Sequence, residues 1–242
     1  MFFQKKIKSK IYLEKNKITT RKTRFIDASY KKKISEIYNM DDRLLGDSNN
    51  KKILKYLENN VKKFDVVILM DYGHGFVNKK IYKILKNKSK FLAINCQTNS
   101  ANHGFNFITK YEKSDYMCID EPELRLATSN NYDGIEKIIK FHLLKKINCK
   151  NITITMGRDG SFSHLGSKSL IVPALISDKV IDTIGAGDVF LVLSSLLYSI
   201  KTDQLTTSLI SNIVGALKVD ILGHSQPISK TNFYSILNHI LK

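Results

Sequence analysis

Short apolar runs that alternate with longer amphipathic stretches constrain the fold of this chain more than any other feature. The runs cover residues 65–70, 91–94, 116–119 and 151–155. Helical patterns lie between and after them, at residues 78–87, 121–127, 132–147, 186–200, 205–219 and 231–241. Continuously apolar strands are typical of sheets covered on both faces, and the helices would serve as crossovers between parallel strands. The pattern therefore predicts an α/β fold with a doubly wound, mostly parallel sheet and helices on both faces.

Length and composition fit one domain of this kind. A chain of 242 residues that is 43% hydrophobic can bury one substantial core. We expect residues 65–242 to form the α/β domain and residues 1–64 to form a basic segment, with two short strands in residues 11–26 and a helix at residues 51–61. No apolar run is long enough to span a bilayer, so we expect a cytoplasmic protein without a membrane partner.

The cysteines and the net charge exclude some other classes of protein. Cys96, Cys118 and Cys149 include no Cys-x-x-Cys pair, so we expect buried free thiols and neither disulfides nor a zinc site. The formal charge of +17 raises the hypothesis of nucleic-acid binding. The excess is mostly lysine scattered among Asn and Ile, without an arginine-rich helix or an aromatic-basic motif, so we expect no nucleic-acid partner.

Polar residues and a glycine follow the predicted strands. Asp71, Asn95, Asp120 and Gly157 each stand at or just after the end of an apolar run. In a doubly wound sheet the carboxyl ends of the strands meet at one edge, where ligands bind. The sequence therefore predicts a ligand crevice at this edge.

The most specific motif is the string Ile-Asp-Thr-Ile-Gly-Ala-Gly-Asp-Val-Phe at residues 181–190, which opens an apolar helix. A Gly-Ala-Gly turn at a helix start exposes backbone N–H groups at the positive end of the helix dipole, which favours an anion such as phosphate. Asp188, in the first helical turn, places a carboxylate beside that anion. A base next to an anion hole suits phosphoryl transfer to a hydroxyl.

This string resembles the signature of ribokinase-like (PfkB) sugar kinases, Asp-Thr-x-Gly-Ala-Gly-Asp-x-Phe. The resemblance implies ATP as the phosphoryl donor, Asp188 as the catalytic base toward a sugar hydroxyl, and an anion hole formed by the N–H groups of Gly185, Ala186 and Gly187. It also implies that Asp182 and Thr183 shape the turn and approach the nucleotide phosphates.

Two further segments fall in the order that the family shows. Thr155, Gly157 and Gly160, in Thr-Met-Gly-Arg-Asp-Gly, resemble the loop that borders the ATP phosphates. Asp120 and Glu123, in Asp-Glu-Pro-Glu, stand where the family has an Asn-x-x-Glu that orients Mg²⁺, with Asp in place of Asn. A plain helix N-cap with acids in the first turn explains this pair equally well. Mg²⁺ is expected in either case, because ATP phosphates carry it.

Several other motifs are similar to those of heptose-phosphate kinases. They include Asp-Tyr-Gly-His-Gly at residues 71–75, Asn-Cys-Gln-Thr-Asn at residues 95–99 and Glu-Pro-Glu-Leu-Arg-Leu at residues 121–126. This likeness implies a sugar or sugar-phosphate substrate, with a phosphorylated heptose as one candidate, and a role in surface-polysaccharide biosynthesis. The amides of residues 95–106 suit sugar hydroxyls, but they suit an internally hydrogen-bonded surface loop equally. His74 and His103 are further candidates for substrate contact.

The resemblance starts partway through the family pattern, near Thr19. The family's opening strand and its glycine-rich, sugar-binding segment have no counterpart, so residues 1–64 would be a remnant of the lid and substrate region. We therefore expect either a fragment or a chain that a partner completes, a complementing N-terminal chain or a second copy in a homodimer. The leading hypothesis is an ATP-dependent sugar kinase, and the alternative is an inactive nucleotide-binding remnant or a subunit that needs its partner.

Overall fold

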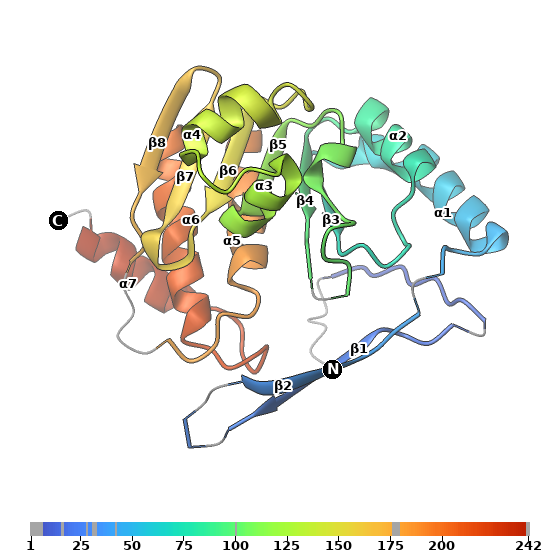
Figure 1. Cartoon of the computed structure of the whole chain (residues 1–242), viewed down its shortest axis with the longest axis horizontal. Coiled ribbons are helices and arrows are strands. Elements are labelled where there is room, and N and C mark those ends of the chain that lie inside the picture. The colour runs from blue at the N-terminus through green and yellow to red at the C-terminus, as the bar shows by residue number, and fades with distance from the viewer. Residues whose placement is uncertain are drawn as a thin grey trace.

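A six-stranded sheet with helices on both faces, and a separate two-stranded hairpin, make up the computed structural model (Figure 1). The structure describes residues 7–15, 17–27, 29–30, 33–41, 43–99, 101–175 and 180–240. Figure 1 shows the hairpin standing away from the body of the large sheet.

The large sheet has the strand order β3-β4-β5-β6-β7-β8. Its strands are β3 (Val67–Asp71), β4 (Leu92–Cys96), β5 (Tyr116–Asp120), β6 (Asn151–Thr155), β7 (Ser161–Leu165) and β8 (Lys168–Val172). Strands β3 to β6 are parallel, whereas β7 and β8 pair antiparallel at one edge. The predicted fold class and all four predicted strands are confirmed, and the β7–β8 hairpin is an addition that the apolar pattern did not reveal.

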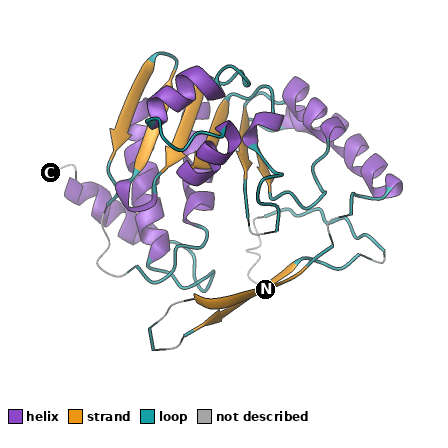
Figure 2. Ribbon diagram, viewed as in Figure 1, coloured by secondary structure: helices purple, strands orange, loops and turns teal. Residues whose placement is uncertain are grey.

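Helices cover both faces of this sheet (Figure 2). They are α1 (Asp47–Asn60), α2 (Lys79–Lys88), α3 (Glu121–Thr128), α4 (Ile135–Ile138), α5 (Ala186–Ser199), α6 (Gln204–Val219) and α7 (Lys230–Ile240), with a π-helical continuation of α4 at Ile139–Leu143 and 3₁₀ turns at Val61–Lys63, Ile108–Lys110 and Gly157–Asp159. The predicted helix at residues 132–147 begins later, because Asn130 accepts hydrogen bonds from the N–H groups of Tyr132 and Asp133 in a turn. Within the described ranges, none of these helices combines the length and apolar character that crossing a membrane requires.

The core lies on both sides of the sheet. On one face, Phe190, Leu191 and Tyr198 of α5 pack against Tyr116 and Cys118 of β5. The cluster on the other face draws on α1, α2, α3 and the α4 region, and it includes Ile53 and Val61. A boundary at residues 64/65 is still a prediction. The three cysteines are buried free thiols, as expected.

The small sheet pairs β1 (Arg21–Ile26) with β2 (Lys33–Asn39) in antiparallel register. The prediction of two strands within residues 11–26 is wrong for the second strand, which lies after a turn. The chain reverses at Asp27, whose carboxylate accepts hydrogen bonds from the N–H groups of Ser29 and Tyr30.

Candidate functional site

The direction of α5 places its N-terminus at the carboxyl edge of the sheet. Tyr116, at the start of β5, donates a hydrogen bond to Ser194 Oγ (2.9 Å), and its ring lies 4.8 Å from that of Tyr198. Both partners belong to the C-terminal half of α5, so α5 runs antiparallel to β5. The start of α5 therefore lies near the end of β5, where Asp120 and Glu123 are found.

A turn at residues 182–188, called here the anion turn, leads into α5. Gly185 precedes the helix with φ = 80°, in the left-handed region that glycine adopts without strain. The Asp182 carboxylate accepts hydrogen bonds from Ile184 N (3.0 Å) and Gly223 N (2.8 Å). Asp182 thus fixes the turn and ties it to the segment that follows α6. The first N–H groups of α5 lack intrahelical acceptors by the geometry of any helix, so they are available to an acceptor outside the helix, and the anion role stays a prediction.

Three side chains surround the α-carbon of Gly185. A Cβ atom there would lie 3.3 Å from His224 Cε1, 3.3 Å from Lys218 Cε and 3.9 Å from Asp188 Oδ2. Burial raises the pKa of the half-buried Asp188 carboxyl above its usual range, and the nearby His224 and Lys218 partly offset this rise. The turn therefore brings one carboxylate and two basic side chains together.

Asp120 and Glu123 form a reciprocal cap at the start of α3. Glu123 N donates to Asp120 Oδ1 (2.7 Å), and Asp120 N donates to Glu123 Oε2 (2.9 Å). Glu123 Oε1 also accepts from Thr98 N (2.8 Å). The cap interpretation of this pair is confirmed, and the magnesium role is still a prediction.

Glu123 is buried, and its surroundings are acidic. Burial, together with the charges of Asp120 and Asp188, raises the pKa of Glu123 to about 7. Glu123 and Asp188 therefore lie within electrostatic reach of each other, although they belong to different helices. Hard carboxylate oxygens gathered in this way fit a divalent cation. The described part of the chain contains no group of three or more His, Cys, Asp or Glu side chains that could hold a metal ion.

The loop after β6 lies at the same edge. Thr155 pairs in register with Asp120 of the neighbouring strand, so the loop begins beside the α3 cap. Gly157 has φ = 59° and open space around its α-carbon. Gly160 has φ = 92°, and a Cβ atom there would lie 2.1 Å from Val172 O. Close packing against Val172 therefore explains the glycine at position 160, whereas no atom lies close to the position of a Cβ on Gly157.

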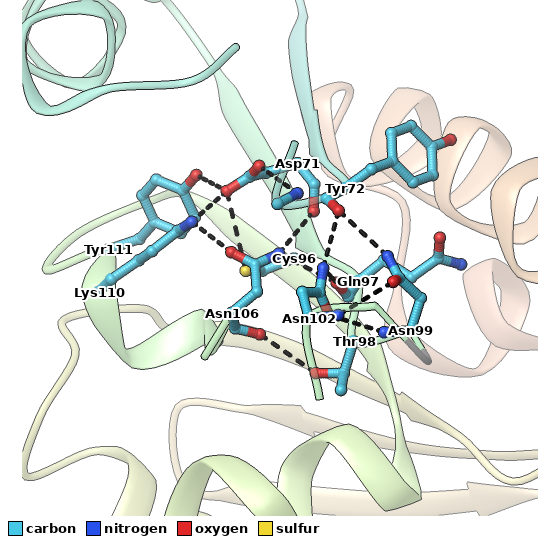
Figure 3. A network of polar contacts seen from close by, with 11 residues as sticks. Asp71, Tyr72, Cys96, Gln97, Thr98, Asn99, Asn102, Asn106, Lys110 and Tyr111 are labelled. Atoms are coloured by element: carbon cyan, nitrogen blue, oxygen red, sulfur yellow. Dashed lines mark hydrogen bonds and ion pairs between the residues drawn. The ribbon is translucent and has the colours of Figure 1, made fainter. Parts of the chain in front are cut away.

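The polar loop after β4 uses its amides within the protein (Figure 3). Asn102 Nδ2 donates to Tyr72 O (2.8 Å), and Asn106 Nδ2 donates to Gln97 O (2.9 Å) and Asp71 O (3.2 Å). Of the two readings of residues 95–106, the internally hydrogen-bonded loop is therefore the observed one. Through Thr98 N, this loop also holds Glu123.

The buried Asp71 anchors the far side of the same loop (Figure 3). Its carboxylate accepts hydrogen bonds from Tyr111 OH and Gly73 N and forms an ion pair with Lys110. Burial and the charge of Asp188 raise the pKa of the next residue, Tyr72, which places Tyr72 near the site as well.

Sequence reasoning found the residues of the anion turn but missed several of their neighbours. Tyr72, Lys218 and His224 lie close to Asp188 or Gly185 but far from residues 181–190 in the sequence. Of the three, only Tyr72 stands in a motif that the sequence shows, at residues 71–75, and no role was predicted for it. The only signal for His224 is the preceding glycine, and Lys218 looks like any lysine at the end of a helix. Of the two histidines considered earlier, His74 follows β3 and His103 is exposed on the polar loop.

Comparison with known proteins gives both curated relatives and solved structures. The bifunctional protein HldE of Aliarcobacter butzleri is 24% identical over 219 residues, which are 89% of this chain and 44% of that protein. The chain thus spans less than half the length of this relative. The ribokinase of Arabidopsis thaliana, solved with ribose and ATP, has a TM-score of 0.64 at 15% identity. The matched region covers 92% of this chain and 70% of the ribokinase chain. The ribokinase of Thermotoga maritima has a TM-score of 0.65 at 18% identity, and the match covers 91% of this chain and 70% of that ribokinase.

The solved structures bear out the ribokinase-like fold, and a family match extends from the N-terminal hairpin through the anion turn. This match, to the pfkB family of carbohydrate kinases, covers residues 8–204. The chain belongs to the pfkB family of carbohydrate kinases.

Proposed function

We propose that this protein catalyses ATP-dependent phosphoryl transfer to a hydroxyl of a sugar or sugar phosphate, with Asp188 as the general base. One observation carries the proposal: a half-buried carboxylate stands beside a glycine turn at a helix N-terminus, with basic side chains next to it. Asp188 would accept the hydroxyl proton while the N–H groups of Gly185, Ala186 and Gly187 stabilise charge on the moving phosphoryl group.

The other predicted residues have supporting roles in this proposal. Asp182 and Thr183 would hold the shape of the anion turn close to the nucleotide phosphates. Thr155, Gly157 and Gly160 would border those phosphates from the neighbouring strand, and the open space at Gly157 favours close approach of a ligand to the backbone.

Asp120 and Glu123 would hold Mg²⁺ together with the ATP phosphates. The bound ion would neutralise phosphate charge during transfer. The neighbouring carboxylates of Asp120 and Asp188 disfavour the ionised form of Glu123, and a cation at this place would relieve that repulsion. Glu123 would keep its two backbone hydrogen bonds and offer its remaining lone pairs.

A phosphorylated heptose is the substrate that we propose within this class. The motifs shared with heptose-phosphate kinases and the similarity to HldE proteins favour it. In this proposal residues 65–242 are the nucleotide-binding and catalytic part, and residues 1–64 are a remnant of the lid and substrate region.

A second candidate is a subunit that needs a complementing chain. Strand β3 lies at the end of the sheet and pairs only with β4 among the described residues. Its other edge offers backbone groups to another strand. Co-expression with the N-terminal portion of a heptose-phosphate kinase tests this candidate. A stable complex that gains activity would support it, and a fully active isolated chain would exclude it.

An ADP-release assay with heptose phosphates, other sugar phosphates and free sugars tests the leading proposal. Asp188→Asn should lower kcat by about 10²–10⁴-fold and leave ATP affinity within a few-fold, because the base acts on the acceptor. Asp65→Asn is the matched control, since Asp65 is an exposed carboxylate paired with Lys90 far from the turn. Equal activity of the Asp188 variant and the wild type would rule out this site as the source of the activity.

A further inference from the structure

Lys218 is a buried lysine at the end of α6, with only 4% of its surface exposed. Its ammonium group donates to Gly223 O (2.8 Å) and Ile221 O (3.4 Å). None of the ion pairs among the described residues involves Lys218. Burying an ammonium group without an ion pair costs free energy, so its place in the fold calls for a reason.

Lys218 reaches the anion turn in two ways. Its Cε atom lies 3.3 Å from the position of a Cβ on Gly185, so the end of the side chain packs directly against the turn. It also holds the carbonyl of Gly223, whose N–H group is bound by the carboxylate of Asp182. A displacement of Lys218 would therefore disturb both Gly185 and Asp182.

The charge of Lys218 acts in the same direction as the start of α5. A helix N-terminus carries roughly half a positive charge, and a buried ammonium beside it adds a full charge where screening by water is weak. Lysine has three N–H donors, and the two carbonyls use two of them. The protein thus holds the ammonium group in place close to the start of α5.

We infer that Lys218 is a positioning residue that supplies a fixed positive charge beside the anion turn and thereby strengthens binding of the ATP phosphates. This inference rests on the proposed function, because it assumes that the turn binds phosphate. The competing explanation is purely structural, since lysines often cap the last carbonyls of a helix.

A variant that loses the positive charge of Lys218 but keeps an N–H donor distinguishes the two explanations. Lys218→Gln keeps an N–H donor for the carbonyls and removes the charge. Lys146→Gln is the control, because Lys146 is an exposed lysine in the turn after the α4 region. Calorimetric titration of each full-length variant with MgATP and with adenosine, which has no phosphates, gives the two affinities.

The expected result is a loss of ATP affinity of about tenfold or more in Lys218→Gln, with adenosine affinity unchanged and the Lys146 control equal to wild type. Unchanged ATP affinity in Lys218→Gln, or an equal loss for ATP and adenosine, would overturn the inference while leaving the proposed function intact. A wild-type protein that does not prefer ATP over adenosine would instead overturn the proposed function, and the role of Lys218 with it.

A second variant covers the case in which Lys218→Gln does not fold. Lys218→Ala leaves a space that a free ammonium ion can enter, so ammonium chloride should restore the preference for ATP over adenosine where equal sodium chloride does not. Failure of ammonium to restore this preference would also overturn the inference.

Discussion

Gly160 and Gly215 differ in what a methyl group on the α-carbon would meet. At Gly160 (φ = 92°) a Cβ would lie 2.1 Å from Val172 O, whereas at Gly215, inside α6, it would meet nothing within 4 Å. We expect Gly160→Ala to lower the free energy of unfolding by about 2 kcal/mol or more, and Gly215→Ala to raise it by about 0.5–1 kcal/mol. Urea denaturation measures both, and equal effects would contradict the close packing at Gly160.

Asp188 gives a prediction about pH. Burial raises its pKa, and the general base must be ionised to act, so kcat/KM should rise with pH through the raised pKa and then level off. The acid limb should have its midpoint above the ordinary aspartate value of about 3.9. In Lys218→Gln the midpoint should move further up, since a charge that favours the carboxylate is lost. A pH profile of kcat/KM for both proteins checks this, and a lower midpoint in the variant would contradict it.

At the scale of single residues, the sequence predicts site residues that are adjacent in the chain and misses those that only the fold brings together. Gly185 and Asp188 were found because the helix start, the glycines and the acid are adjacent in the chain. Lys218 and His224 approach Gly185 only because α6 packs against α5. No spacing rule links these residues to the motif, so the basic side of the site could not be predicted.

The hairpin of β1 and β2 has one carboxylate, Glu36, whose side chain is only 9% exposed. Glu36 forms ion pairs with Lys22 (3.1 Å), Arg24 (2.7 Å) and Lys33 (3.7 Å). Burial alone would raise its pKa, but hydrogen bonds from Tyr38 and Lys22 and the charges of Lys22 and Lys33 outweigh this effect and lower it to about 2. An isolated two-stranded sheet is marginally stable, so this network should matter.

The sign of the pH effect follows from that lowered pKa. The stabilisation by Glu36 is complete above the unfolded pKa of about 4.3 and is lost as pH falls toward 2. Amide protection factors in the hairpin should therefore fall between pH 5 and about 2.5, and Glu36→Gln should already show low protection at pH 6. Strands of the large sheet serve as the internal control. Equal amide protection in the variant and the wild type at pH 6 would show that Glu36 does not stabilise the hairpin.

At the scale of elements, the strands that the sequence predicted are the ones that are apolar throughout. Strand β7 was not predicted because buried polar residues break its apolar pattern, and in β8 only Val172 is buried. Ser163 and His164 are almost fully buried in β7, and Ser163 Oγ shares a hydrogen bond with Tyr198 OH of α5 (2.8 Å). Tyr198 of the distant helix α5 satisfies Ser163, and Ser169 of β8 lies 3.1 Å from His164 Nδ1. The sequence therefore shows polar residues where the fold has a core strand.

At the scale of the whole molecule, the net charge of +17 is compatible with a nucleotide-binding or a nucleic-acid-binding protein, and ligand binding distinguishes the two. A nucleotide-binding protein is stabilised by saturable binding at one site, whereas a basic nucleic-acid-binding protein gains stability from polyanions in a strongly salt-dependent way. The family match favours the first reading. Thermal unfolding of the full chain tests it directly.

MgATP at about 100 times its Kd should add about 2.7 kcal/mol to the free energy of unfolding and raise Tm by roughly 5–10 °C for a chain of this size. Because the acidic cluster around Glu123 favours a cation, EDTA should remove most of this shift while ATP stays present. Raising the salt concentration from 50 to 200 mM should change the shift little, since few charges are involved. Duplex DNA in place of ATP should give no shift at 200 mM salt. A large shift with DNA that disappears with salt, and none with MgATP, would favour the nucleic-acid reading over the kinase.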